Sequence, residues 1–179
     1  MTGKLLFNSE PTPYTRAIFS LDDTTLLYDD VRMFGAIEYG SERADRQGPD
    51  ALVSVAPEKL KRNAPIKAVL LNQKVFSGVG NIYADEALFR ARIRPTARSL
   101  SKPRAQALLQ AVDEVLREAI EKRGSSVSDY VDTEGRSGTF QQSHRVYQRE
   151  GQPCVNCGSA IKRIVIGGRS THYCPRCQR

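Results

Sequence analysis

The stretch Cys154-Val155-Asn156-Cys157, followed after sixteen intervening residues by Cys174-Pro175-Arg176-Cys177, decides the architecture of the last part of this chain. Two Cys-x2-Cys pairs at this separation are typical of a zinc site with four thiolate ligands. Four thiolates complete a tetrahedral shell and leave no position for a water molecule. We therefore expect one structural Zn²⁺, with the ligands Cys154, Cys157, Cys174 and Cys177.

The segment between the two cysteine pairs predicts a β-hairpin. Residues 161–166 and 170–173 have the composition of short strands, and Gly167-Gly168 supplies the turn between them. Arg169 then lies at the tip of the hairpin, beside glycines that allow a close approach of the backbone. A contact with phosphate and an ordinary solvated turn arginine both remain open for Arg169.

The middle of the chain reads as helical. Residues 65–73 and 81–89 form two helical patterns, and the glycine-rich turn 77–80 separates them. Asn81 is placed to cap the second helix, with Asp85 and Glu86 near its positive end. Backbone N–H groups at such a helix start suit a phosphate, although a tightly packed helical hairpin is an equal alternative. A dinucleotide site is excluded, because the turn follows a helix and lacks a third glycine.

A third helix shows the clearest apolar period, stops at Gly124, and is followed by a polar loop over residues 125–140. The apolar positions of this helix are Ala105, Leu108, Leu109, Val112, Val115, Leu116, Ala119 and Ile120.

The first 40 residues predict strands. Residues 17–21 and 25–28 flank a turn at Asp22-Asp23 and should form a hairpin, and residues 1–7 and 35–39 are further strand candidates. Together with the helices and the zinc hairpin, they indicate an α+β fold. We expect three domains, at residues 1–50, 51–140 and 141–179.

Composition and charge limit the class of protein. The chain has 179 residues, 40% of them hydrophobic and 26% charged, and no apolar run long enough for a membrane span. We also find no secretory leader, so we expect a cytoplasmic protein with reduced thiols. Lys and Arg exceed Asp and Glu by 27 to 20, and the last 40 residues hold seven basic residues against one acidic residue. This excess favours a polyanionic partner such as a nucleic acid.

Three stretches resemble one family, the formamidopyrimidine-DNA glycosylases. They are residues 65–92 (PIKAVLLNQKVFSGVGNIYADEALFRAR), 130–140 (YVDTEGRSGTF) and 153–179, which ends RSTHYCPRCQR. The resemblance implies a partial N-terminal β-sandwich, a helix-two-turns-helix domain and a zinc finger. It also implies a monomeric bacterial enzyme of base-excision repair, associated with the nucleoid. Such enzymes release oxidised purines such as 8-oxoguanine and formamidopyrimidines, then cut the abasic strand by β,δ-elimination.

The same resemblance assigns roles by position. Asn81 and Arg169 match a pair that clamps phosphates, and Arg169 matches the arginine linked to δ-elimination, which makes it the one catalytic candidate. Met1, Arg32 and Phe34 match residues that fill the space left by an extruded base. Arg62, Lys67 and Tyr83 match further DNA-backbone contacts. The segment that closes over the everted base corresponds to Ser126, Val127, Ser128, Asp129 and Tyr130.

The chain also departs from the family pattern. Neither the N-terminal proline nucleophile with its following glutamate nor the catalytic lysine has a match here, so we expect this chain alone to be inactive. A damaged-DNA-binding fragment without turnover is therefore one alternative, and an endonuclease VIII-type enzyme for oxidised pyrimidines is another. An RNA-associated module and a zinc ribbon that docks proteins are less favoured classes.

Overall fold

A computed structural model describes residues 3–39, 47–53, 55–61, 63–127 and 130–179. Its contacts divide the chain into two compact units. We call Met1–Gly40 with Ala119–Ser143 the sheet unit, and Ser41–Glu118 with His144–Arg179 the helical unit. This division crosses the three domains expected from the sequence, whose boundaries stay a prediction.

The sheet unit contains a three-stranded antiparallel sheet. Its strands are β1 (Lys4–Phe7), β2 (Thr15–Leu21) and β3 (Thr24–Asp29), in the order β1-β3-β2. Leu21 pairs with Thr24 across the turn, where Asp22 has a φ of 43°. The predicted hairpin at Asp22-Asp23 is thus confirmed.

The fourth strand predicted over residues 35–39 is wrong, since these residues have no regular secondary structure. The Asp30 carboxylate accepts the backbone N–H groups of Arg32 (3.2 Å) and Gly35 (2.8 Å). Met33 between them has a φ of 54°. These bonds fold the chain back on Asp30, so the amides at 32 and 35 are held by a side chain instead of by a neighbouring strand.

The helical unit contains α1 (Ile66–Leu70), α2 (Asn81–Arg90), the 3₁₀ helix η2 (Pro57–Leu60) and most of α3 (Lys102–Glu121). α1 is shorter than the predicted helix over 65–73 because Asn72 starts a turn. The Asn72 side chain accepts the N–H of Lys74 (3.0 Å), and its carbonyl accepts the N–H of Val75 (2.7 Å).

The turn between α1 and α2 is closed by one side chain. Gln73 Nε2 donates to the Val79 carbonyl at 3.0 Å, and Gln73 Oε1 accepts the N–H of Gly78 at 3.1 Å. Gly78 has a φ of 91°, which a side chain would strain. The Gln73 side chain therefore fixes the conformation of the turn that leads into α2.

α3 follows its predicted period. Most of the predicted apolar positions are buried, whereas Ile120 in the last turn is 62% exposed. In the helical unit, Arg90 of α2 forms ion pairs with Glu114 (3.4 Å) and Glu118 (2.7 Å) of α3.

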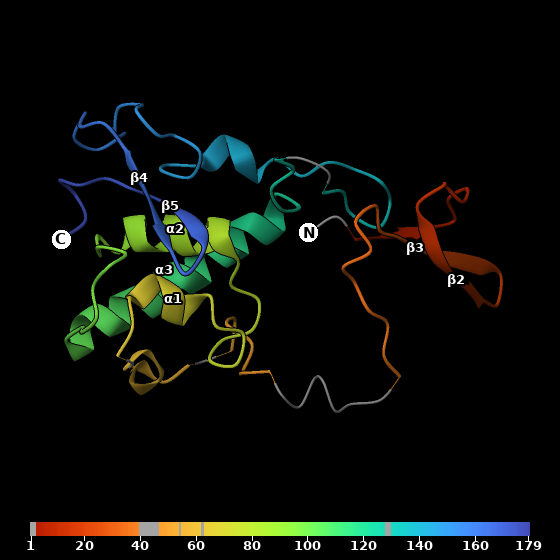
Figure 1. Cartoon of the computed structure of the whole chain (residues 1–179), viewed down its shortest axis with the longest axis horizontal. Coiled ribbons are helices and arrows are strands. Elements are labelled where there is room, and N and C mark those ends of the chain that lie inside the picture. The colour runs from red at the N-terminus through yellow and green to blue at the C-terminus, as the bar shows by residue number, and fades with distance from the viewer. Residues whose placement is uncertain (1–2, 40–46, 54, 62, 128–129) are drawn as a thin grey trace. The chain divides into compact units, whose positions relative to one another are not determined.

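The C-terminal hairpin forms as predicted. β4 (Lys162–Ile166) pairs antiparallel with β5 (Arg169–Tyr173), and β5 packs on α2 (Figure 1). Gly167 and Gly168 both have positive φ, at 56° and 73°, as a two-residue hairpin turn requires. A second 3₁₀ helix, η3 (Phe140–Ser143), ends the loop that follows α3. Within the described ranges, no helix is both long enough and apolar enough to cross a bilayer.

Candidate functional site

The four cysteines form a compact metal site. Their Sγ atoms lie within 4.8 Å of one another, with Cys154–Cys177 at 3.9 Å and Cys157–Cys174 at 3.5 Å. A tetrahedral Zn²⁺ with Zn–S bonds of about 2.3 Å needs sulfurs about 3.8 Å apart. The four thiolates therefore fit one structural zinc ion.

The metal site shares its apolar core with α2. Phe89 of α2 packs in one buried cluster with Val146, Cys154, Ile161 and Cys174. Cys154 and Cys174 therefore lie where the metal site packs against α2.

A buried glutamine adds a polar link between the zinc site and the loop after α2. Gln178 accepts the N–H of Cys174 at 2.8 Å and donates to the Ile93 carbonyl at 2.9 Å. Gln178 therefore connects the second cysteine pair to the loop after α2 through two hydrogen bonds.

A buried ion pair fixes the hairpin against α1 and α2. Lys67 Nζ lies 2.7 Å from Asp85 Oδ1, and both side chains are fully buried. Burial lowers the pKa of the Lys67 ammonium, and the charge and hydrogen bond of Asp85 oppose this shift. The other Asp85 oxygen accepts the backbone N–H of His172 in β5 at 2.8 Å.

The Ser170 carbonyl of β5 accepts hydrogen bonds from both α1 and α2. It accepts one hydrogen bond from Lys67 Nζ at 2.7 Å and another from Asn81 Nδ2 at 3.0 Å. The preceding residue, Arg169, is exposed. The structure therefore brings Asn81, Lys67 and the backbone beside Arg169 together.

This geometry bears on two expectations. The Lys67 ammonium is enclosed and bound to Asp85 and Ser170, and its DNA-backbone contact, implied by the resemblance, stays a prediction. Asn81 is not the N-cap of α2, a position taken by Gly80 without a side-chain bond. The Asn81 side chain reaches β5 instead, and its buried Oδ1 has no hydrogen-bond partner among the described residues.

Glu86 holds the entry to the zinc finger. Its carboxylate accepts the backbone N–H groups of Arg145 (2.9 Å), Val146 (3.0 Å) and Tyr147 (2.8 Å). Burial raises the pKa of the Glu86 carboxyl, and these three donors oppose the rise by favouring the charged form. Asp85 and Glu86 are therefore buried organisers of the unit and not dipole partners at the helix start.

The two histidines belong to the same packed region. Tyr147 makes edge contacts with both His144 and His172, at centroid distances of 5.4 and 5.2 Å. Burial lowers the pKa of His144 to about 4, so its ring is neutral at pH 7.

In the sheet unit, Asp30 shapes the loop that carries Arg32 and Phe34. Phe34 is 83% exposed, and the Arg32 guanidinium lies 5.4 Å from the centre of its ring. Sequence reasoning missed Asp30, although an acidic residue just before a strand-to-loop transition is a usual turn organiser. The loop presents a cation and an aromatic ring side by side.

The loop after α3 is closed by hydrogen bonds between its own residues. Ser126 Oγ donates to the Tyr130 carbonyl at 2.6 Å and accepts the N–H of Gly138 at 2.8 Å. A side chain at Gly138 would meet the Gly124 carbonyl at 2.2 Å, so the two ends of the loop lie in close contact. Val127 and Tyr130 are partly exposed, at 37% and 47%.

Of the remaining predicted site residues, the structure describes one and leaves four outside its described ranges. Tyr83 is half-buried in the first turn of α2. Met1, Arg62, Ser128 and Asp129 lie outside the described residues.

We expect Cys174→Ser to lower bound zinc, unfold the hairpin and weaken DNA binding together, because the ligand is also part of the shared core. Zinc content by mass spectrometry, hydrogen exchange of residues 161–173 and duplex affinity check this. Val155→Ala, at an exposed position between Cys154 and Cys157, is the control and should leave zinc content, hydrogen exchange and duplex affinity unchanged. Unchanged zinc and binding in Cys174→Ser would contradict the expectation.

Removal of the Lys67 charge should destabilise the protein by about 3–5 kcal/mol, because Lys67→Met leaves the buried Asp85 carboxylate without its cation. Urea unfolding measures this free energy. The exposed pair Arg117–Asp113 is the matched control, where Arg117→Met should leave the free energy of unfolding nearly unchanged because solvent screens the pair. The double variant Lys67→Met/Asp85→Asn should recover much of the loss. Equal costs for Lys67→Met and Arg117→Met would refute the role of the pair.

Comparison with known proteins agrees with this geometry. Residues 44–131 match the family model described as "Formamidopyrimidine-DNA glycosylase H2TH domain", and residues 151–179 match "Zinc finger found in FPG and IleRS". The chain is 52% identical over 188 residues to the formamidopyrimidine-DNA glycosylase of Solibacter usitatus, covering 100% of this chain and 71% of that protein. For the Thermus thermophilus enzyme, identity is 46% over 196 residues, with 99% and 72% covered.

Two solved structures show the same fold. The crystal structure of the Thermus thermophilus MutM (Fpg) protein superposes with a TM-score of 0.87 at 44% identity, covering 99% of this chain and 73% of that one. Lactococcus lactis Fpg in complex with abasic-site DNA gives a TM-score of 0.86 at 31% identity, covering 100% and 72%. The fold is α+β, with a helix-two-turns-helix domain and a structural zinc finger, and the chain belongs to the formamidopyrimidine-DNA glycosylase family.

Proposed function

We propose that this chain acts in base-excision repair and binds duplex DNA that carries oxidised purines or abasic sites. The observation that carries this proposal is the pair of hydrogen bonds from Lys67 and Asn81 to the Ser170 carbonyl. They hold the strand that begins with the exposed Arg169 against the start of α2.

The local chemistry suits a phosphate. An amide NH₂ group carries two hydrogens, and Asn81 uses one of them on Ser170. The second N–H and the Arg169 guanidinium are complementary to phosphate oxygens. Lys67 acts as a positioning residue for this clamp, since its ammonium fixes Ser170 from below the surface.

The sheet unit supplies residues for base extrusion. An extruded base leaves a gap in the stack, and a side chain that fills it offsets an unstacking cost of a few kcal/mol. The exposed Phe34 with Arg32 beside it has the chemistry for this role, with Arg32 toward the unpaired cytosine. Met1 is proposed for the same task, and the loop 126–130 for closing over the extruded base.

The substrate class follows from the family. A further Lactococcus lactis Fpg structure contains Fapy-dG DNA. We propose excision of 8-oxoguanine and formamidopyrimidines by the complete enzyme, followed by β,δ-elimination with Arg169 in the second elimination. Oxidised pyrimidines, the substrates of the endonuclease VIII type, are the second candidate. We further propose a monomer at the bacterial nucleoid, because chromosomal DNA is its partner.

We also propose that these 179 residues bind damaged DNA without turnover, since none of them matches the family's nucleophilic proline, the following glutamate or the catalytic lysine. Borohydride trapping on an 8-oxoguanine:cytosine duplex and on an abasic duplex tests this. We expect abasic-duplex binding without a covalent band. A covalent band would show that an amine of this chain acts as nucleophile, and absent binding would overturn the clamp.

Arg169→Gln should weaken abasic-duplex binding by about tenfold and reduce the slope of log K against log[salt] by about one, because one phosphate contact is lost. Arg163→Gln, on the neighbouring strand, is the matched control for charge and should change the slope less. Fluorescence anisotropy across a salt series measures both. Equal slopes in the two variants would exclude Arg169 as a specific phosphate ligand.

A further inference from the structure

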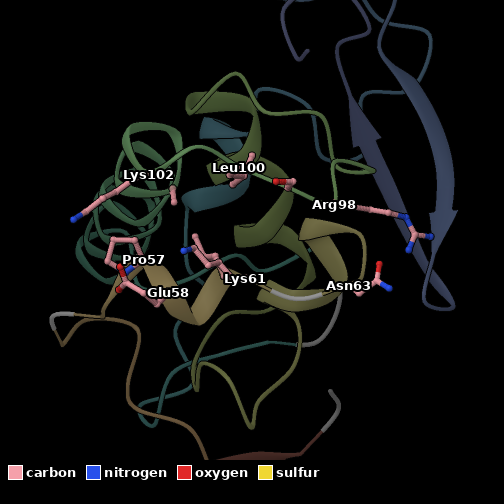
Figure 2. Close-up of a pocket in the computed structure, with 10 residues that line it drawn as sticks. Pro57, Glu58, Lys61, Asn63, Arg98, Leu100 and Lys102 are labelled. Carbon is pink, nitrogen blue, oxygen red and sulfur yellow. The ribbon is translucent and has the colours of Figure 1, made fainter.

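The helical unit has a second concave site outside the clamp. A cavity of about 500 Å³ lies between η2, the segment 98–100 and the start of α3. This volume is in the range of ligand pockets. Figure 2 shows Lys102 at one end and Arg98 at the other, with Lys61 and Leu100 between them.

The cavity has an apolar floor and a basic rim. Leu60 and Ala105 are buried, and the half-buried Leu100 adjoins them. The rim carries the exposed side chains of Lys61, Arg98 and Lys102, and Glu58 is the one acidic residue among the described lining residues. Within the described part of the chain, these three cations form no ion pair that would neutralise them.

The start of α3 adds positive potential. The N-terminal end of a helix carries a partial positive charge, and acidic residues normally offset it. The first turn of this 20-residue helix contains no acidic residue and begins with Lys102. Helix stability alone would favour the opposite charge here, and the positive potential of the rim is complementary to an anionic ligand.

We propose that this cavity docks a short acidic peptide segment of a partner protein, with an apolar side chain on the Leu60–Leu100 floor and carboxylates on the basic rim. A DNA backbone would satisfy the cations but has no apolar side chain to bury on that floor. The floor therefore favours a peptide. This binding site is separate from the DNA clamp in the residues it uses, and its test is independent of repair activity.

The test uses the full chain and the fluorescein-labelled peptide Gly-Glu-Glu-Leu-Asp-Phe-Glu-Glu. Anisotropy gives its affinity, and amide shifts in NMR give its location. We expect shifts at residues 57–63 and 98–105, and loss of affinity by about tenfold in Lys61→Glu and in Lys102→Glu. Peptides with Leu and Phe changed to Ser, or with Glu and Asp changed to their amides, should each bind more weakly. Circular dichroism confirms that the variants are folded.

Lys59→Glu is the matched control, because Lys59 is an exposed lysine of η2 that does not line the cavity. The proposal is overturned if Lys59→Glu weakens peptide binding as much as Lys61→Glu, since the effect is then general electrostatics. Absent peptide binding at millimolar concentration also overturns it. Equal loss of abasic-duplex affinity in the Lys61 and Lys102 variants, without NMR shifts from the peptide, would assign the rim to DNA instead.

Discussion

The helical unit depends on the buried ion pair between Lys67 and Asp85. Two opposite charges without solvent are tolerated only where each also finds hydrogen-bond partners, and the hairpin provides them. Lys67 binds the Ser170 carbonyl, and Asp85 binds the His172 N–H. The pair therefore joins α1, α2 and β5 next to the exposed Arg169. These three segments are far apart in the sequence. A hydrophobic pair could neither donate to the Ser170 carbonyl nor accept from the His172 N–H, the two bonds that set the position of β5 along the helices.

Much of the architecture was predictable from local patterns. The cysteine spacing and Gly167-Gly168 predict the zinc hairpin because metal geometry and positive φ impose strict residue requirements. The period of α3 is likewise a local property. Most of the buried polar network was not predictable, because its partners are distant: Asp85 contacts His172, and Glu86 contacts residues 145–147. A lysine on a short helix is usually solvent-exposed, so no sequence signal marks Lys67 as buried.

The predicted site residues separate by the same criterion. Asn81 and Arg169 are near one another because the network holds β5 against α2, whereas Arg32 and Phe34 are set by the short-range bonds of Asp30. At the first residue of the strand expected over 35–39, the Asp30 carboxylate takes the Gly35 amide that a β-ladder would need. The DNA-binding roles of all predicted site residues stay predictions, and Met1, Arg62, Ser128 and Asp129 lie outside the described residues. Local propensity thus determines where helices and strands form, and buried charged groups determine how these elements pack together.

Glu86 gives the zinc finger an attachment that does not require the metal. Its three hydrogen bonds reach residues 145–147, before the first cysteine ligand, and its own position is fixed within α2. When the ion dissociates, the hairpin loses its cross-link, but residues 145–147 keep their hydrogen bonds to Glu86 of α2. We therefore expect metal loss to unfold the hairpin locally, and remetallation to require refolding of the hairpin and not of the whole helical unit. The attachment at Glu86 is thus independent of the four cysteine ligands.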